Sequence, residues 1–248
     1  MALQEELEQQ GNFLFKYRGT LPLLLLSGSM VVFAYVQKYS VGYDNLISYE
    51  NYEIIALVVS MLGLIVRIYT VGYSPANTSG RNTDEQLADV VNQTGIYSMV
   101  RHPLYVGNFL MWLGPALLVQ NAWFIVAFIF IYWVYYERIM FAEEQFLRRK
   151  FGDVYLKWAE KTPAFILSLK NYIKPNISFS LKKVIKKEKN GLAAVFLIFY
   201  IFRLIKEYIQ TKTFALDTWI FYAMVGSLIL YFILKFIKKY TDVFEDGR

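Results

Sequence analysis

Long apolar runs separated by shorter polar stretches dominate the sequence. A helix that crosses a bilayer needs about 20 mostly apolar residues, with a range of about 17–25. Six runs come near that length, and they cover residues 21–36, 54–71, 104–119, 122–136, 191–209 and 214–237. The pattern therefore predicts an all-α fold, a polytopic transmembrane bundle of about six spans.

Three features of these runs bear on the topology. Only Gln120 and Asn121 separate the third run from the fourth, which predicts two antiparallel neighbours. Gly114 and Pro115 interrupt the third run, so this segment either crosses with a kink or is re-entrant. Arg67 lies near the end of the second run, where a long side chain can snorkel to the interface.

Two long polar regions, residues 72–101 and 137–190, lie between the runs. The second begins as a continuation of the fourth helix, and Gly152-Asp153 predicts a helix end followed by a new helix start. A short interfacial helix is expected from there to Pro163. These boundaries divide the chain into an N-terminal segment with the first span (1–53), a core (54–175), and a basic linker with two further spans (176–248).

Composition agrees with a membrane environment. The chain is 56% hydrophobic, whereas a soluble domain is about 45–50% apolar. Lys and Arg number 26 against 20 Asp and Glu. Because the basic residues flank the apolar runs, we expect contact with anionic lipid headgroups and not with nucleic acid. The run 182–189 is the clearest such stretch, and residues 1–10 lack signal-peptide features and are expected to stay in the chain.

Cysteine and histidine usage excludes several kinds of chemistry. The chain has no Cys and one His, so disulfides, thiolate nucleophiles and a metal site are not expected. Basic residues gather at span ends on one side, which predicts that both termini are cytoplasmic. The stretch 203–212 carries several positive charges on the other side and opposes this orientation.

The first candidate site is the block Arg101-His102-Pro103 with Tyr105 and Gly107. Pro103 stands at the position that Pro favours at a helix start. A helix N-terminus with Arg and His beside it can bind an anion, and Gly107 lets another group lie close to the backbone. A lone His at a membrane edge is alternatively a plain interfacial residue.

The second candidate site is Glu137-Arg138 followed by Glu143-Glu144. It has a plain alternative, a solvated helix end in which Glu144 pairs with the Arg four residues later. However, the block directly follows the aromatic run 132–136, and charges at that depth usually line a cavity or pair with each other. A polar tract at 77–83 contains Arg81, which is a further donor for an anionic ligand or else part of an ordinary loop.

Together the two blocks carry a family resemblance. The stretch TGIYSMVRHPLYVGNFLMWLGPALL, followed by ERIMFAEEQFLRRKFGDVYLKWAEKTPAF, resembles the isoprenylcysteine carboxyl methyltransferase family. These integral membrane enzymes use S-adenosylmethionine, and phospholipid methyltransferases are related to them. The match covers roughly residues 57–165. Its halves, Arg-His-Pro-x-Tyr-x-Gly and Arg-x4-Glu-Glu-x2-Leu-x3-Phe-Gly-x2-Tyr, occur in the expected order.

The resemblance implies an S-adenosylmethionine site open to the cytosol, beside a lipid site open to the membrane. The implied cofactor-binding residues are Arg101, His102, Tyr105, Gly107, Glu143 and Glu144. Arg138 is the implied catalytic residue, and acceptor binding is assigned to Arg81, Tyr135 and Arg138. An acceptor that is already an anion needs no general base, which agrees with the absence of a base dyad.

The acceptor is expected to be a membrane lipid. The tract SGRNTDEQLADV and the extension after Lys174 are similar to a bacterial subgroup that includes lipid A phosphate methyltransferases. We therefore rank a lipid phosphate first, a prenylcysteine or other lipid carboxylate second, and a phospholipid amine third. The expected location is the bacterial inner membrane. A non-enzymatic transporter is a distant alternative. A transporter is expected to have charges within its spans and two similar halves, whereas here the charges lie at span ends and the halves are not alike.

Overall fold

The computed structural model describes residues 2–39, 48–75, 78, 86–214, 216–241 and 243–244. Across this part of the chain the regular structure is helical and contains no strand, which confirms the all-α prediction. The helices are α1 (Leu3–Lys16), α2 (Thr20–Tyr39), α3 (Tyr49–Gly72), α4 (Pro103–Leu118), α5 (Ala122–Phe151), α6 (Asp153–Ala159), α7 (Leu181–Thr211) and α8 (Trp219–Tyr240). Two 3-10 turns, η1 (Ile96–Ser98) and η2 (Leu169–Asn171), lie in the connections.

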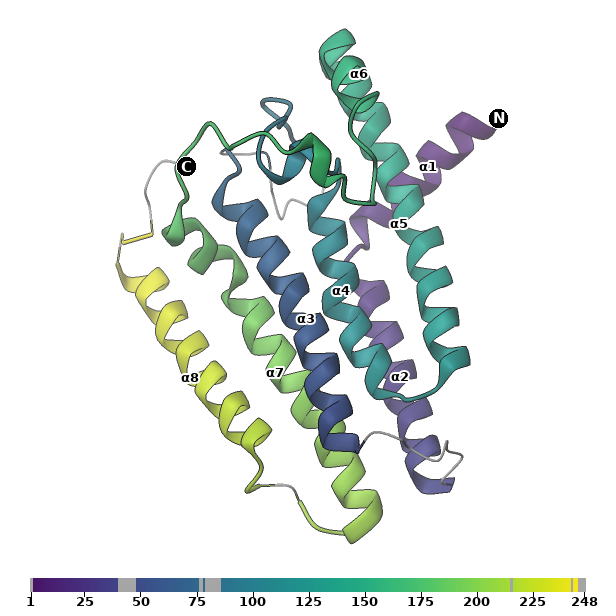
Figure 1. The fold of residues 1–248 in the computed structure, drawn as a ribbon, viewed down its shortest axis with the longest axis vertical. Coiled ribbons are helices and arrows are strands. Elements are labelled where there is room, and N and C mark those ends of the chain that lie inside the picture. The colour runs from purple at the N-terminus through teal and green to yellow at the C-terminus, as the bar shows by residue number, and fades with distance from the viewer. Residues whose placement is uncertain are drawn as a thin grey trace.

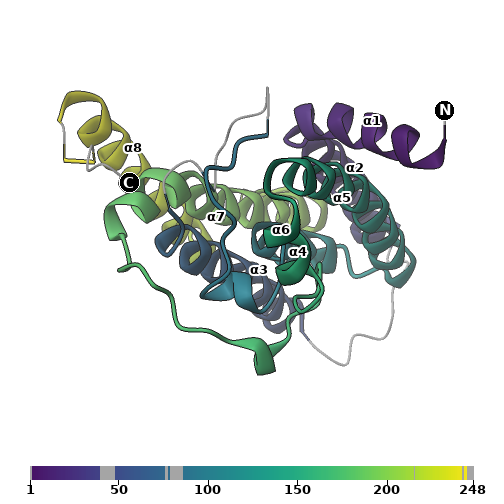
Figure 2. The same cartoon turned by 90° about the horizontal axis from the view of Figure 1, so that it is seen from above.

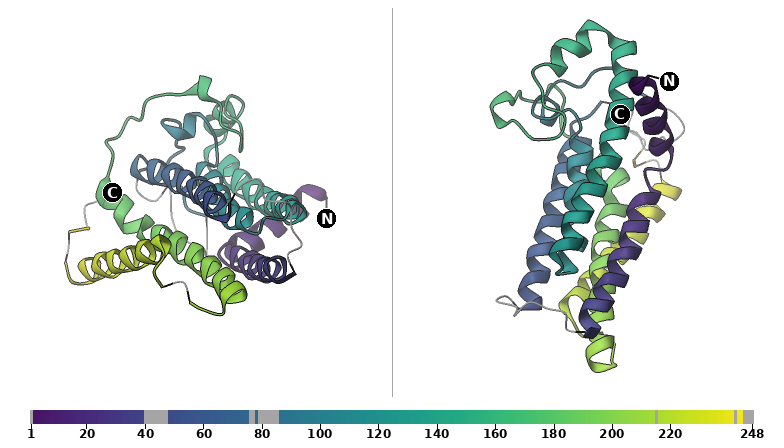
Figure 3. Two further views of the ribbon diagram at one scale, coloured as in Figure 1. Left: turned by 60° about the horizontal axis from the view of Figure 1, so that its bottom comes forward. Right: turned by 90° about the vertical axis from the view of Figure 1, so that its right-hand side faces the viewer.

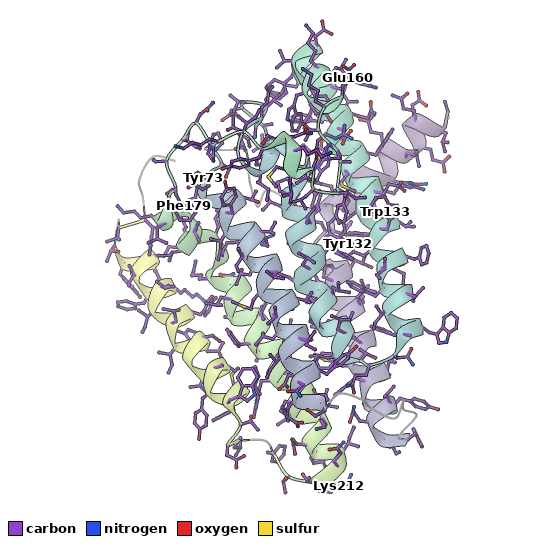
Figure 4. All side chains as sticks on the ribbon, viewed as in Figure 1. Tyr73, Tyr132, Trp133, Glu160, Phe179 and Lys212 are labelled. Atoms are coloured by element: carbon purple, nitrogen blue, oxygen red, sulfur yellow. The ribbon has the colours of Figure 1, made fainter. Side chains whose placement is uncertain are left out.

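Helices α2, α3, α4, α5, α7 and α8 run side by side along the long axis of the molecule (Figure 1). In the bundle α3 packs against α4 and α7, and α8 packs on the outside of α7. The last turns of α5, together with α6, project beyond the other helices, and α1 lies against this projecting part (Figures 1 and 3). We call this the α6 end of the bundle; Figure 4 shows Glu160 there and Lys212 at the opposite end.

All six predicted runs form helices, but six spans are not confirmed. Four helices, α2, α3, α5 and α8, are long and apolar enough to cross a membrane, and the chain is a multi-pass membrane protein. The 16 residues of α4 reach only about 24 Å, which is shorter than a hydrocarbon core of about 30 Å. Helix α7 has 31 residues but is not apolar enough to be counted among the helices that could cross a membrane.

Pro115 does not break α4. A proline has no N–H to donate to the carbonyl four residues earlier, which here belongs to Met111. Ser60 on α3 donates its hydroxyl to that carbonyl oxygen at 3.0 Å. Gly114 leaves room for this approach, because a Cβ there would meet the Ser60 side chain. The neighbouring helix thus satisfies the group that Pro115 leaves unpaired.

A buried ion pair joins α3 and α7 at the end opposite α6. Arg203 donates to both carboxylate oxygens of Glu53, at 3.2 and 2.6 Å, and Glu53 is fully buried. Glu50 also lies 3.3 Å from the Arg203 guanidinium. Since Arg203 is neutralised inside the bundle, it does not act as the exposed positive charge that the sequence pattern of 203–212 suggested.

The basic run 182–189 does not lie wholly at the surface. Lys183 is buried, and its Nζ donates to the carbonyl oxygens of Ser74 and Pro75 at 2.6 and 2.9 Å. These carbonyls follow the C-terminal end of α3, where a cation is favourable. Phe179 packs edge-on against Tyr73 beside this contact, with ring centres 5.2 Å apart (Figure 4). Lys183 therefore fastens α7 to α3 instead of contacting headgroups.

Candidate functional site

A returning segment after α6 holds the Arg101-His102-Pro103 loop in place. Helix α5 ends at Phe151, and Gly152 makes the turn with φ +51°, a region that favours glycine, as the sequence predicted. Helix α6 then ends at Ala159, before the predicted end at Pro163. The chain turns back there, and the carbonyls of Pro163 and Ala164 accept hydrogen bonds from the backbone N–H groups of the loop at 2.9 and 3.2 Å. Figure 2 shows this connection passing around the outside of the bundle.

Both ring nitrogens of His102 face carboxylates on α5. Its Nε2 lies 3.0 Å from Oε1 of Glu144, and its Nδ1 lies 3.5 Å from Oε2 of Glu143. Pro103 begins α4 immediately after it, as predicted. The structure thus brings the two charged blocks of the sequence together at the α6 end of the bundle.

The two carboxylates control the charge of this imidazole. Burial by itself lowers the pKa of His102, but hydrogen bonds and charge attraction from Glu143 and Glu144 outweigh it and hold the pKa above its usual value. The charged imidazolium, which donates from both nitrogens, is the form that this pair of acceptors favours.

The neighbouring side chains complete a polar network. Tyr105 donates its hydroxyl to Oε1 of Glu143 at 2.6 Å, and Arg101 lies 3.3 Å from Oε2 of Glu144. A buried atom of this network, Nε of Arg101, nevertheless has no hydrogen-bond partner within the described residues. Buried polar groups are rarely left unpaired, so the network has bonding capacity for a ligand.

This network borders a cavity of about 410 Å³, a volume typical of small-molecule sites. Its walls come from the polar loop, the start of α4, the inner face of α5, the α1–α2 turn, α3 and α7. The charged or titratable lining residues are Arg18, Arg67, Tyr97, Arg101, His102, Tyr105, Tyr136, Lys187, Glu143 and Glu188. Apolar lining residues include Phe15, Leu104, Phe146 and Leu147.

Arg67, which the sequence suggested would snorkel, is instead fixed in the cavity wall. Its Nε and Nη2 donate to the two carboxylate oxygens of Glu188 on α7 at 2.8 and 2.7 Å. Its Nη1 donates to Asn108 on α4 at 2.5 Å. The sequence feature that could have identified Arg67 as a site residue is its position as a charge inside an apolar run. A second such feature is Glu188, the one acidic residue in the basic run 182–189.

Three predicted site residues lie away from this cavity. Gly107 does let another group approach, but that group is α3, because a Cβ there would meet the Arg67 stem and the Gly63 carbonyl oxygen. The Arg138 backbone faces Gly11 of α1, and its guanidinium pairs with Glu137 at 3.1 Å. Tyr135 donates its hydroxyl to the Leu14 carbonyl at 3.2 Å. Arg138 and Tyr135 therefore do not line this cavity, and their assignment to acceptor binding stays a prediction.

The rotation of successive residues around α5 explains why Arg138 does not line the cavity. Each helical residue turns by about 100°, so Arg138 points about 200° away from Tyr136, which lines the cavity. That opposite side of α5 is the side on which α1 packs. Arg81 lies outside the described residues. Among the described residues, no group of three His, Asp or Glu side chains is arranged to hold a metal ion.

Comparison with known proteins gives an independent view of the same segment. The phospholipid methyltransferase family profile matches residues 53–154. The protein-S-isoprenylcysteine O-methyltransferase of Schizosaccharomyces pombe is 35% identical over 94 residues, which are 38% of this chain and 38% of that protein. The enzyme of the same name from Saccharomyces cerevisiae is 31% identical over 96 residues, 39% of each chain.

A relative with a different name matches a longer stretch. The nickel-cobalt-cadmium resistance protein NccN of Alcaligenes xylosoxydans xylosoxydans is 32% identical over 139 residues, 55% of this chain and 59% of that protein. The chain spans about two fifths of the length of the first two curated relatives. No solved structure shows a significant match.

Proposed function

We propose that this membrane protein transfers a methyl group from S-adenosylmethionine to an anionic oxygen of a membrane-embedded acceptor, because its residues 53–154 match the phospholipid methyltransferase family profile. The observation that carries the proposal is the meeting of His102 with Glu143 and Glu144 beside a cavity of about 410 Å³. The catalytic unit is the core 54–175, with contributions to the cavity from both flanking segments.

The residues of the polar network fit a zwitterionic cofactor. S-adenosylmethionine carries a carboxylate, an ammonium group, ribose hydroxyls and a sulfonium. The buried Nε of Arg101, which has no partner among the described residues, suits the carboxylate. Glu143, with a side chain 24% exposed, suits the ammonium group or the ribose hydroxyls. His102 and Tyr105 orient Glu143 by the contacts described above.

When bound, the cofactor supplies an electrophilic methyl group on a positively charged sulfur. The new bond joins this methyl to the acceptor oxygen while the methyl–sulfur bond breaks, and its electron pair stays on sulfur. No proton moves if the acceptor is already an anion, so the chain needs no general base. What its residues contribute is alignment of the two reactants and, through Phe15, Phe146 and Leu147, exclusion of water from the cavity.

The preferred acceptor is a lipid-linked carboxylate. The two yeast relatives named above are protein-S-isoprenylcysteine O-methyltransferases. Their names support the carboxylate that the sequence ranked second and give no support to a lipid A phosphate. The charge of the lining favours an anion in either case: it has four basic residues (Arg18, Arg67, Arg101, Lys187) and two acidic ones (Glu143, Glu188). An amine acceptor would meet repulsion there.

The location of the site follows the distribution of basic residues. Arg148, Arg149 and Lys150 end α5 at the α6 end of the bundle, and basic residues accumulate on the cytoplasmic side of membrane proteins. We therefore assign the site to the cytoplasmic face of a bacterial inner membrane, with the cofactor entering from the cytosol.

The test uses the purified full chain in detergent with methyl-tritiated S-adenosylmethionine. N-acetyl-S-farnesylcysteine, phosphatidic acid and phosphatidylethanolamine serve as carboxylate, phosphate and amine acceptors. We expect label in the farnesylcysteine product, and base treatment releases it as volatile methanol because the product is an ester. Label on phosphatidic acid alone would restore the phosphate ranking, and label on none of the three would contradict the proposal.

Cofactor binding is measured separately by isothermal titration calorimetry. Glu143→Gln and His102→Ala are expected to weaken binding at least tenfold, because each removes a charged partner from the network. Glu160→Gln is the matched control, since that carboxylate is exposed at the α6 end and does not line the cavity. Absence of binding by the wild-type protein would refute the cofactor assignment.

A further inference from the structure

Part of the cavity wall comes from outside the family segment 53–154. These lining residues are Phe15, Arg18, Gly19, Lys187 and Glu188. They belong to the end of α1, the turn into α2, and the first turns of α7. Two of them are cations, and Glu188 fixes a third cation, Arg67, through both of its carboxylate oxygens. The flanking segments thus control most of the positive charge in the cavity.

Arg67 is held so that its guanidinium keeps bonding capacity. An arginine has five N–H donors, and three of those of Arg67 are used, two by Glu188 and one by Asn108. Two donors remain without a partner in the part of the chain that the structure describes. Gly107 allows this placement, because a Cβ there would meet the Arg67 stem. The side chain therefore presents a fixed edge of the guanidinium to the cavity that it lines.

Arg18 lines the same cavity. It follows α1, and its guanidinium lies over the ring of Phe15, 3.9 Å from the ring centre. Tyr135 ties the end of α1 to α5 through the Leu14 carbonyl. Arg18 and Arg67 line the same cavity as Tyr136 of α5. The two arginines therefore line one cavity from different segments, the α1–α2 turn and α3.

These three cations are distinct from the cofactor network. Arg101 and His102 pair with Glu144 and Glu143. Arg18, Arg67 and Lys187 come from other segments, the α1–α2 turn, α3 and α7. A planar guanidinium binds a two-oxygen anion at two points. A carboxylate or phosphate headgroup is the ligand chemistry that such a set of donors recognises.

We propose that Arg18, Arg67 and Lys187 form the subsite for the acidic headgroup of the acceptor, with Glu188 as the positioning residue for Arg67. The inference rests on the proposed methyl transfer, and it assigns acceptor recognition in part to the α1–α2 turn and to α7, which lie on either side of the family segment 53–154. In this arrangement Arg18, Arg67 and Lys187 take the role that the sequence assigned to Arg138.

The experiment measures steady-state methyl transfer by the full chain to N-acetyl-S-farnesylcysteine and to phosphatidic acid. Arg18→Gln and Lys187→Gln are each expected to raise the KM for the acidic acceptor about tenfold, the effect of losing one charged hydrogen bond. The Kd for S-adenosylmethionine is expected to change less than twofold. Arg18→Lys, which keeps the charge, is expected to recover part of the loss.

Lys182→Gln is the matched control, because it removes the same charge from the same helix at an exposed position outside the cavity. Glu188→Gln releases one side of Arg67 and is expected to lower kcat more than it raises the KM, since the guanidinium is still present but no longer fixed. An unchanged acceptor KM in both Arg18→Gln and Lys187→Gln would overturn the inference. So would a loss of cofactor binding with the acceptor KM unchanged.

A binding measurement without turnover separates this inference from the proposed function. N-acetyl-S-farnesylcysteine is expected to raise the melting temperature of the wild-type protein, and Arg18→Gln and Lys187→Gln are expected to abolish that shift. A wild-type protein that binds the acceptor in this charge-dependent way but transfers no methyl group would refute the methyltransferase proposal and keep the acidic subsite. Equal melting-temperature shifts in the wild type and both variants would refute the subsite without contradicting the proposed function.

Discussion

His102 Nε2 lies 3.0 Å from Glu144 Oε1, although the two residues are 42 positions apart in the sequence. Glu143, the preceding residue, approaches the other ring nitrogen at 3.5 Å. The imidazole at the start of α4 is thus held from both sides by one helix, α5. This contact ties the loop that precedes α4 to the polar half of α5 and forms one wall of the cavity.

The first prediction concerns the pH dependence of stability. The pKa of His102 is raised in the folded protein, so its ion pairs stabilise the fold fully below about pH 6.5, the unfolded value. That stabilisation is lost as the pH rises through the higher folded-state pKa. We expect the melting temperature, followed by tryptophan fluorescence in detergent, to fall between about pH 6 and about pH 9.

His102→Gln isolates this contribution, because glutamine does not titrate. The variant is expected to be less stable than the wild type at about pH 6 and to approach it at about pH 9. A stability difference between the two proteins that stays constant across this range would show that Glu143 and Glu144 do not raise the pKa of His102.

The second prediction concerns the hydrogen bond from Ser60 to the Met111 carbonyl. Ser60→Ala is expected to lower the free energy of unfolding by about 0.6 kcal/mol, the average for such bonds between membrane helices. In a Pro115→Ala background the cost should shrink, because residue 115 then donates its own N–H to Met111. A double-mutant cycle in SDS titrations measures this coupling.

Ser27→Ala is the control for that cycle, since Ser27 is exposed on α2 and donates its hydroxyl to the carbonyl of Leu23 in its own helix. It is expected to leave stability nearly unchanged. Full additivity of Ser60→Ala and Pro115→Ala would contradict the compensation between the two residues.

The third prediction tests the close contact of α3 and α4. Gly107→Ala places a methyl group against the Gly63 carbonyl oxygen and the Arg67 stem, and overpacking of this kind costs about 1–3 kcal/mol. Gly28→Ala on α2 is the control, because a Cβ there meets nothing within 4 Å and alanine favours a helix. The measurement is the melting temperature, and equal values for the two variants would refute the contact.

The fourth prediction compares a buried with an exposed ion pair. Glu53→Gln leaves Arg203 buried with one charged partner fewer and is expected to cost about 3–5 kcal/mol of stability. Arg149→Gln removes the exposed pair with Glu8, whose N–O distance of 2.6 Å is equally short, and is expected to cost less than about 1 kcal/mol. Similar costs for both variants would mean that Glu53 is not the buried anchor of α7.

The helices of the core were predictable from the sequence, and so was the start of α4. An apolar run of fixed length has one stable form in a bilayer, and Pro103 and Gly152 act through their own backbone geometry. The helix α1 was not predicted, because residues 1–10 are polar and acidic and carry no apolar run of their own. It is docked by Gly11 and Phe15, which pack on other elements.

The two charged blocks of the cavity wall could be found from their motifs, but the cations facing them could not. The partner of Arg67 is Glu188, 121 residues away on α7, and no spacing in the chain relates them. Arg138 shows the opposite case, since its motif is present but the rotation of α5 turns it away from the cavity.

By itself, then, the sequence determined the local elements and the chemistry of the residues at Arg101-His102 and Glu143-Glu144. Only the tertiary structure decided which face of each helix lines the cavity, and that α1 and α7 complete its wall. The physical reason is that the length of an apolar run and the backbone preferences of its residues are properties of a continuous segment. The partner of a charged side chain instead depends on how separate helices rotate and pack against one another.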